Sequence, residues 1–173
     1  KYVTPFMNRL DTLLSDQILP LVDPSADRVH IITNRIDTPT GSMANATDGN
    51  PNTEIIYKTP SKVEPGDYIG VMRTTPIDVD SVSILLGQSG NLNDTFPSAK
   101  LQYTQDGVNW IDIGEETSST TDMSQTGLGL KNVLGMRVLC TGSNPNIWLG
   151  VRDFVLNPEA GGDSGETGEG SFS

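Results

Sequence analysis

A chain of 173 residues is long enough for one domain with a buried core. Hydrophobic residues make up only 35% of it, and its 18 glycines and 11 prolines favour short strands and many turns over a helical bundle. The formal net charge of −11 argues against nucleic acid and anionic membrane surfaces as partners, because both require clustered lysine and arginine. No apolar run approaches the roughly 18 residues of a membrane span, so we expect no membrane insertion.

The first predicted element is a helix over residues 4–19. Thr4 can cap this helix, Pro5 takes its favoured first position, and apolar residues then recur at helical spacing. The chain starts at Lys1 with neither an initiator methionine nor a signal peptide. We therefore interpret residues 1–28 as a helical segment from the end of an upstream domain. Whether the helix packs on that domain or on the rest of this chain stays open.

From residue 29 onward, short β-rich segments alternate with clusters of Gly, Pro, Asn and Asp, which indicates an antiparallel β-sandwich. Asp106-Gly107 predicts a hairpin with a type I′ turn. Cys140 is the only cysteine, so no internal disulfide forms, and its place in a strand favours a buried thiol. Residues 159–173, rich in Gly, Ser and acids, are expected to form a flexible tail or linker. The predicted strands cover 29–33, 67–73, 79–87, 99–105, 109–113, 136–141 and 148–156.

The sequence presents no recognisable catalytic arrangement. His30 is the only histidine and lies in a predicted strand, so no Ser-His-Asp triad can be argued from it. Acidic pairs such as Glu115–Glu116 could be imagined as the two carboxylates of a glycosidase. Acidic residues in polar segments are usually solvated, however. We therefore expect that the chain is not itself an enzyme.

The stretch NATDGNPNTEIIY, residues 45–57, gathers oxygen-bearing side chains within a few positions. Asp48, Asn50 and Thr53 could curl around a calcium ion, which takes about six to eight oxygen ligands. The loop is not an EF-hand, because the sixth position counted from Asp48 is Thr53 instead of glycine. Asp-Gly and Asn-Pro are also strong turn formers. The loop alone therefore leaves both a cation site and an ordinary turn open.

Taken in order, several segments resemble discoidin-like domains, also called coagulation factor type C domains, and most closely the carbohydrate-binding modules of family 32. YTQDGVNW resembles the strand and hairpin of that family, and WLGVRDF resembles its closing strand, W-x-x-V-x-E-F. The resemblance covers residues 30–157 and implies an all-β fold, a discoidin-like antiparallel β-sandwich or jelly roll, over residues 29–158. The segments that carry it are ATDGNPNTEI, GDYIGV, VDSVSILLG, LQYTQDGVNWIDI, GMRVLCTG and WLGVRDFVLN.

The chain is also similar to modules that follow the catalytic domain of family 84 β-N-acetylglucosaminidases and bacterial hyaluronidases. A helical region precedes the module in those enzymes, which would account for the helix predicted over residues 4–19. This resemblance implies that the catalytic domain of the same polypeptide is a partner of the module.

The family resemblance implies a structural calcium ion, held by an Asp-x-Asn-x-x-Thr loop and an acidic residue of the final strand. This sequence has Asp153 where the family usually has Glu, so the side chain at that ligand position is shorter. Carried over by position, the implied ligands are Asp48, Asn50, Thr53 and Asp153, together with the backbone carbonyls of Asn45 and Arg152.

The resemblance also implies a sugar site, in which an aromatic ring stacks on the apolar face of a sugar and polar side chains bind its hydroxyl groups. By position the aromatic residue is Trp148. A tryptophan packed in the core is the alternative interpretation. The sequence lacks the Arg of the middle loop and the His or Trp near the first loop that sugar-binding members often have. The implied polar partners are Gln88, Asn91, Asn93 and Tyr57.

From this resemblance we expect a noncatalytic, monomeric module of a secreted or surface-attached bacterial glycosidase. It would hold the enzyme near glycans with terminal galactose, N-acetylglucosamine or N-acetylgalactosamine, since tethering raises the effective concentration of the substrate. The alternative is a structural or protein-interaction module of the same enzyme that binds no sugar.

Overall fold

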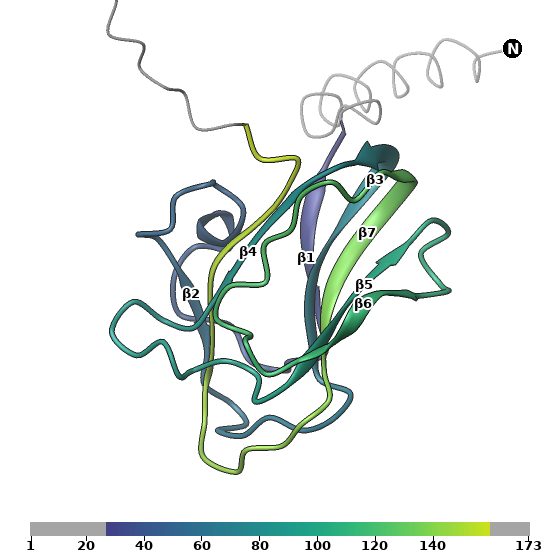
Figure 1. Ribbon diagram of the computed structural model, residues 1–173. Coiled ribbons are helices and arrows are strands. Elements are labelled where there is room, and N and C mark those ends of the chain that lie inside the picture. The colour runs from purple at the N-terminus through teal and green to yellow at the C-terminus, as the bar shows by residue number, and fades with distance from the viewer. Residues whose placement is uncertain (1–26, 160–173) are drawn as a thin grey trace, which may run out of the picture.

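The computed structural model describes residues 27–159, which form two antiparallel β-sheets with a hydrophobic core between them (Figure 1). The five-stranded sheet has the order β1-β3-β7-β5-β6, and the three-stranded sheet has the order β2-β8-β4. The predicted antiparallel sandwich is therefore confirmed. The strands are β1 (Val29–Thr33), β2 (Ile55–Tyr57), β3 (Tyr68–Val79), β4 (Val82–Leu86), β5 (Ala99–Thr104), β6 (Ile111–Thr117), β7 (Leu130–Cys140) and β8 (Leu149–Leu156), and a 3-10 helix, η1 (Met43–Ala46), precedes β2.

The helix predicted over residues 4–19 lies outside the described residues, as does the predicted tail beyond Glu159. Within residues 27–159 no helix is long and apolar enough to cross a membrane.

Each predicted strand overlaps an observed one, and the differences lie in length and in one missed element. β2 was missed because three residues are too few to show an alternating pattern. β3 runs past its predicted end, and its pairing with β7 shifts register between Met72 and Ile77. Pro76 lies within this irregular part, as expected for a residue that cannot donate a ladder hydrogen bond.

The hairpin between β5 and β6 is confirmed, but the predicted type I′ turn is wrong. That turn needs positive φ at both central residues, and only Gly107 has it, with φ of 79°. The Asp106 carboxylate instead accepts hydrogen bonds from the N–H groups of Asn109 (2.7 Å) and Val108 (2.9 Å). These donors hold the pKa of Asp106 well below its usual range. An aspartate side chain thus shapes this loop in place of a second left-handed residue.

Cys140 lies near the end of β7 with 1% of its surface exposed, which confirms the predicted buried thiol. Burial raises the pKa of this thiol to about 11. Its Sγ atom lies 3.1 Å from the carbonyl oxygen of Gly142.

β8 contains a β-bulge that sets the direction of its last side chains. Leu85 of β4 pairs with Asp153, whereas the next residue, Leu86, pairs with Val151, so Arg152 is an extra residue in β8. Because of this insertion, Val151 and Phe154 both face the core and are fully buried. Asp153 is turned to the outer face of the three-stranded sheet instead.

This arrangement predicts different costs for two neighbouring truncations. Phe154→Ala should lower the free energy of unfolding by about 3 to 5 kcal/mol, because it removes a large ring from a closed core. Val155→Ala, on the outer face, should cost less than half as much. Urea unfolding of the two variants measures both values. Equal losses would contradict the bulge at Arg152.

Candidate functional site

The loop of residues 45–53, here called the metal loop, connects η1 to β2 and brings several oxygen atoms together. The Thr53 hydroxyl lies 2.7 Å from Oδ2 of Asp48, 2.9 Å from the carbonyl oxygen of Asn50 and 3.4 Å from that of Asn45. Four of the residues expected to bind calcium therefore meet around one hydroxyl group. The Asn50 side chain turns away, because its Oδ1 accepts the backbone N–H of Asn52 at 3.1 Å. Asn50 thus presents its backbone oxygen to the group.

Asp153 faces this loop from β8 across a hollow of about 450 Å³. The bulge of β8 places Asp153 on the outer face of the sheet, where Ser83 of β4 donates a 2.6 Å hydrogen bond to its Oδ2. The other oxygen, Oδ1, is buried and has no hydrogen-bond partner. The lining residues are Thr47, Asp48, Gly49, Pro51, Ser83, Leu85, Asp153, Val155, Pro158 and Glu159.

The electrostatics of the two carboxylates differ. Burial raises the pKa of Asp153 above its usual value, and the negative charge of Asp48 adds to this, whereas the Ser83 hydroxyl and the backbone N–H groups of Gly49 and Phe154 oppose it. The Thr53 hydroxyl and the Asn50 N–H lower the pKa of Asp48. A buried carboxylate oxygen without a partner, next to a second carboxylate, is a costly arrangement that a cation would relieve. The residues present therefore fit a hard cation such as calcium.

The predicted calcium ligands include only two carboxylates, those of Asp48 and Asp153. Among residues 27–159 there is no group of three or more His, Cys, Asp or Glu side chains that could hold a metal ion. The remaining predicted ligands would be hydroxyl and carbonyl oxygens, which suit calcium and not zinc. Arg152 is the extra residue of the bulge, and its Nη2 donates to the carbonyl oxygen of Leu86 at 3.1 Å.

A second hollow, of about 280 Å³, lies beside Trp148 and is here called the Trp148 pocket. Trp148 precedes β8 and is 37% exposed, so it is not a core residue. Gln88 and Asn91, two of the predicted polar partners, belong to the loop after β4 and line the same pocket. The Lys58 ammonium lies 4.8 Å from the centroid of the Trp148 ring. The lining residues are Ser61, Gln88, Asn91, Asp94, Asn146, Ile147 and Trp148.

Two of the predicted sugar contacts lie elsewhere. Tyr57 is 2% exposed and belongs to the core, because its strand β2 pairs with the buried start of β8. Asn93 lines a neighbouring hollow that contains Phe96 and Thr120. Neither residue is therefore part of the Trp148 pocket.

Asp94 is the pocket residue that the sequence reasoning missed. It is 6% exposed, and its Oδ2 accepts a hydrogen bond from the side-chain amide of Gln88. A carboxylate in a sugar pocket can accept short hydrogen bonds from two hydroxyl groups. No sequence pattern marked Asp94, within NLNDTF, as a site residue. The family resemblance implied only the amide side chains of this loop as sugar contacts.

Close backbone approaches fix the pocket loop to β8. The N–H of Gly87 donates to the carbonyl of Gly150 at 2.8 Å, and the N–H of Gly150 donates to the carbonyl of Asp94 at 2.9 Å. A Cβ atom on Gly150 would meet the backbone nitrogen of Gln88 at 2.5 Å, so no larger residue fits there. Glycine at position 150 therefore allows the loop to lie directly on the strand that follows Trp148.

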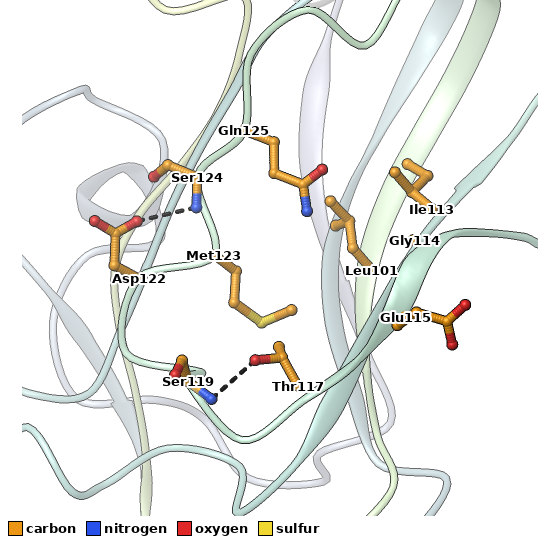
Figure 2. A pocket seen from close by; sticks show the side chains of 10 residues that line it. All are labelled: Leu101, Ile113, Gly114, Glu115, Thr117, Ser119, Asp122, Met123, Ser124 and Gln125. Carbon is orange, nitrogen blue, oxygen red and sulfur yellow. Dashed lines mark hydrogen bonds between the residues drawn. The ribbon is translucent and has the colours of Figure 1, made fainter.

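A third hollow, of about 230 Å³, opens between the β5–β6 edge and residues 119–125 (Figure 2). Met123 and Gln125 extend toward Leu101, whereas the carboxylate of Glu115 points away from them. The Asp122 carboxylate accepts the backbone N–H of Ser124 at 2.9 Å, on the opposite side of the hollow. The two acids do not face each other, so this hollow lacks the facing carboxylates that cleave glycosidic bonds.

Residues 31–135 match the F5/8 type C domain family, which is more than half of the chain. The chain belongs to this family. The match agrees with the fold described above and covers β1 to the middle of β7, including the metal loop and the Gln88–Asp94 side of the pocket. No curated protein matches this F5/8 type C domain.

Solved structures share its fold at low sequence identity. An F5/8 type C domain from Bacteroides fragilis superposes with a TM-score of 0.51 at 17% identity, covering 78% of this chain and 93% of the other. The module CpGH89CBM32-5 from Clostridium perfringens, in complex with GalNAc-β-1,3-galactose, gives 0.53 at 17% identity, covering 74% and 92%. Chitosan-binding module 2 from a chitosanase/glucanase of Paenibacillus sp. IK-5, in complex with chitotriose, gives 0.56 at 17% identity, covering 73% and 93%.

The burial of Asp153 predicts a pH-dependent effect of its removal. In the presence of a chelator at pH 7, Asp153→Asn should raise the free energy of unfolding, because it removes a buried charge close to Asp48. The folded-state pKa is raised, so the stability of the unaltered protein falls as the pH rises from about 3.9 through the folded value. The gain should therefore shrink toward zero in acid.

Urea unfolding at a series of pH values measures this gain. Glu115→Gln, at an exposed carboxyl group that does not line the hollow of Asp153, is the matched control and should change stability little. A gain for Asp153→Asn that does not vary with pH would contradict the assigned burial of the charge.

Proposed function

We propose that this F5/8 type C domain is a noncatalytic glycan-binding module whose sugar site is the Trp148 pocket. The observation that carries the proposal is the combination in one hollow of a partly exposed tryptophan with Gln88, Asn91 and Asp94. A sugar offers an apolar C–H face and a rim of hydroxyl groups, and this pocket has a counterpart for each. The structural neighbours that are bound to GalNAc-β-1,3-galactose and chitotriose support the same function.

In this proposal each side chain has a defined role. Trp148 stacks on the apolar face of a sugar ring through the part of the indole that is exposed to solvent. Asp94 and Asn91 bind hydroxyl groups, the carboxylate as an acceptor and the amide as donor and acceptor. Gln88 keeps Asp94 in place through their side-chain hydrogen bond.

The proposal includes a structural calcium ion held by the metal loop and Asp153. When bound, the ion would neutralise two carboxylates and fix the loop. Asp48, Asp153, the Thr53 hydroxyl and the carbonyl oxygens of Asn45 and Asn50 would hold it, with the Arg152 carbonyl as a further ligand. The unpartnered Oδ1 atom of Asp153 supports this assignment.

We propose further that the ligand is a glycan with terminal galactose, N-acetylglucosamine or N-acetylgalactosamine. The parent protein would be a secreted or surface-attached bacterial glycosidase of the family 84 type, and the module would act as a monomer beside its catalytic domain. The resemblance of WLGVRDF and YTQDGVNW to family 32 modules supports this, as do the sugars bound by the neighbours.

A structural or protein-interaction role without sugar binding is the second candidate. The position of Lys58 favours it, because the ammonium group 4.8 Å from the ring centroid covers part of Trp148. Sugar binding by the covered face would require the lysine to move, at the cost of a cation–π contact of about 0.5–1 kcal/mol.

The sugar site predicts that Trp148→Ala abolishes glycan binding with little loss of stability, because an exposed ring contributes little to the core. Screening on an array of galactose-, N-acetylglucosamine- and N-acetylgalactosamine-terminated glycans identifies the ligand, and titration calorimetry compares the variants. The protein has two tryptophans, so the Trp110→Phe variant leaves Trp148 as the only one, and its fluorescence should change on titration with the bound glycan.

Trp110→Ala is the matched control for the loss of an aromatic ring. Trp110 stacks on Arg137, 4.2 Å away, and takes no part in the pocket, so glycan affinity should be retained. If no glycan on the array binds, or if Trp148→Ala binds with unchanged affinity, the sugar site at Trp148 is contradicted. The structural or protein-interaction role would then be favoured.

The calcium site predicts that chelation lowers the melting temperature and that added calcium restores it by mass action. A free calcium concentration a hundred times the dissociation constant should stabilise the fold by about 2.7 kcal/mol. Asp48→Ala should lose this response, whereas Asp122→Ala, outside the metal loop, should keep it. Identical melting curves with and without chelator, after removal of calcium has been verified, would exclude the structural ion.

A further inference from the structure

We infer that Glu54 is a positioning residue that couples the metal loop to the Trp148 pocket, so that cation binding at one orders the other. Glu54 directly follows Thr53, the last residue of the metal loop, and precedes β2. Its two carboxylate oxygens reach the loop after β4, accepting the backbone N–H of Ser89 at 2.6 Å and the Ser89 hydroxyl at 3.1 Å. The inference rests on the proposed function, since it concerns the same two sites.

On the metal-loop side, the backbone of Glu54 is held in place. The side-chain amide of Asn45 donates to the carbonyl oxygen of Glu54 at 3.2 Å, and the carbonyl of the same Asn45 lies 3.4 Å from the Thr53 hydroxyl. Gly41 packs so closely on Glu54 that a Cβ atom there would lie 2.4 Å from that carbonyl oxygen. Asn45, which would bind the cation, therefore also holds the backbone of Glu54 in place.

On the pocket side, Ser89 lies at the tip of the loop between two pocket residues. Gln88 and Asn91 exchange backbone hydrogen bonds of 3.3 and 3.0 Å across this turn. The tip is exposed and packs little: Ser89, Gly90 and Asn91 are all solvent-accessible, and Leu92 is 46% exposed. Within residues 27–159, the bonds to Glu54 are the only hydrogen bonds that join residues 89–92 to a residue outside their own loop. Glu54 is therefore the main tether of the tip.

The energetic consequence follows from this geometry. A carboxylate that accepts a backbone N–H makes a charge-assisted bond, stronger than a neutral one. If the metal loop is disordered, the backbone of Glu54 is no longer held in place, and its bonds to Ser89 no longer fix the turn that carries Asn91. A sugar must then order this turn when it binds, which lowers its affinity. Because such coupling is reciprocal, calcium should raise glycan affinity by the same factor by which glycan raises calcium affinity.

The first test needs no glycan. Solvent exchange of the Ser89 amide is measured by NMR, with calcium and with chelator, in the unaltered protein, in Glu54→Gln and in the control Glu64→Gln, whose carboxylate pairs with Lys62 on the surface. We expect calcium to slow Ser89 exchange by about tenfold in the unaltered protein and in Glu64→Gln. Glu54→Gln keeps a neutral carbonyl acceptor but loses the charge, so its Ser89 amide should exchange faster than in the unaltered protein and should respond less to calcium. Equal, calcium-independent exchange in all three proteins would overturn the inference.

The second test uses the glycan that the array identifies, with N-acetyllactosamine and GalNAc-β-1,3-galactose as the initial probes. Chelation should weaken binding by about fivefold or more in the unaltered protein. Glu54→Gln should bind more weakly than the unaltered protein and lose most of the calcium dependence, while its melting temperature still rises on addition of calcium. A Glu54→Gln variant whose affinity keeps the full calcium response would overturn the coupling.

The two tests separate failure of the inference from failure of the proposed function. If no glycan binds, the sugar site is absent, and the exchange of the Ser89 amide alone decides whether Glu54 transmits the state of the metal loop. If glycan binds to the unaltered protein and to Glu54→Gln with equal affinity and equal calcium dependence, the proposed function stands and the role of Glu54 is excluded.

Discussion

The placement of Asp153 opposite the metal loop depends on one backbone irregularity, the extra residue Arg152 in β8. A regular strand would place Val151 and Asp153 on the same face, and the core would then have to accept a carboxylate. The insertion allows Val151 and Phe154 to fill the core while Asp153 faces outward to the metal loop. The regular hydrogen-bond ladder between β4 and β8 is interrupted at Arg152. As a result, one strand supplies both core residues and a residue of the candidate metal site.

β8 also carries the second site at its other end. Trp148 lies immediately before the strand, and Gly150 allows the loop that contains Gln88 and Asp94 to lie against it. Both hollows are therefore built on the two ends of one central strand, with loops from β4 and from the segment before β2 folded over it. A strand that is paired on both sides opens less readily than an edge strand.

Local patterning was sufficient to predict most of the sheet, since alternating residues and turn signals mark every strand except β2, although β3 and β7 extend beyond their predicted bounds. It failed where tertiary pairing decides the outcome. Tyr57 belongs to β2, which is too short to show its own period, and only pairing with β8 reveals that its ring is buried. The turn at Asp106 was mispredicted because the carboxylate can satisfy two N–H groups at once, which favours a wider loop.

The candidate sites divide in the same way. The residues of the metal loop are close in sequence, so their meeting around Thr53 could be anticipated, whereas the partnerless oxygen of Asp153 depends on the bulge. Asp94 gave no signal because its role depends on which way the loop closes, and that is set by the contact between Gly87 and Gly150. Sequence patterns identified the loops, and packing determined which side chains in them reach the pocket.

The single cysteine has a practical consequence for the study of this domain. A thiol with a pKa of about 11 and 1% exposure is almost entirely protonated and shielded at neutral pH. We therefore expect the folded domain to form no disulfide-linked dimers through Cys140 in air. A cysteine introduced at an exposed position such as Val108 would react with a maleimide dye while the native thiol stays silent. The fold therefore provides a ready background for single-site fluorescent labelling, with no need to replace Cys140.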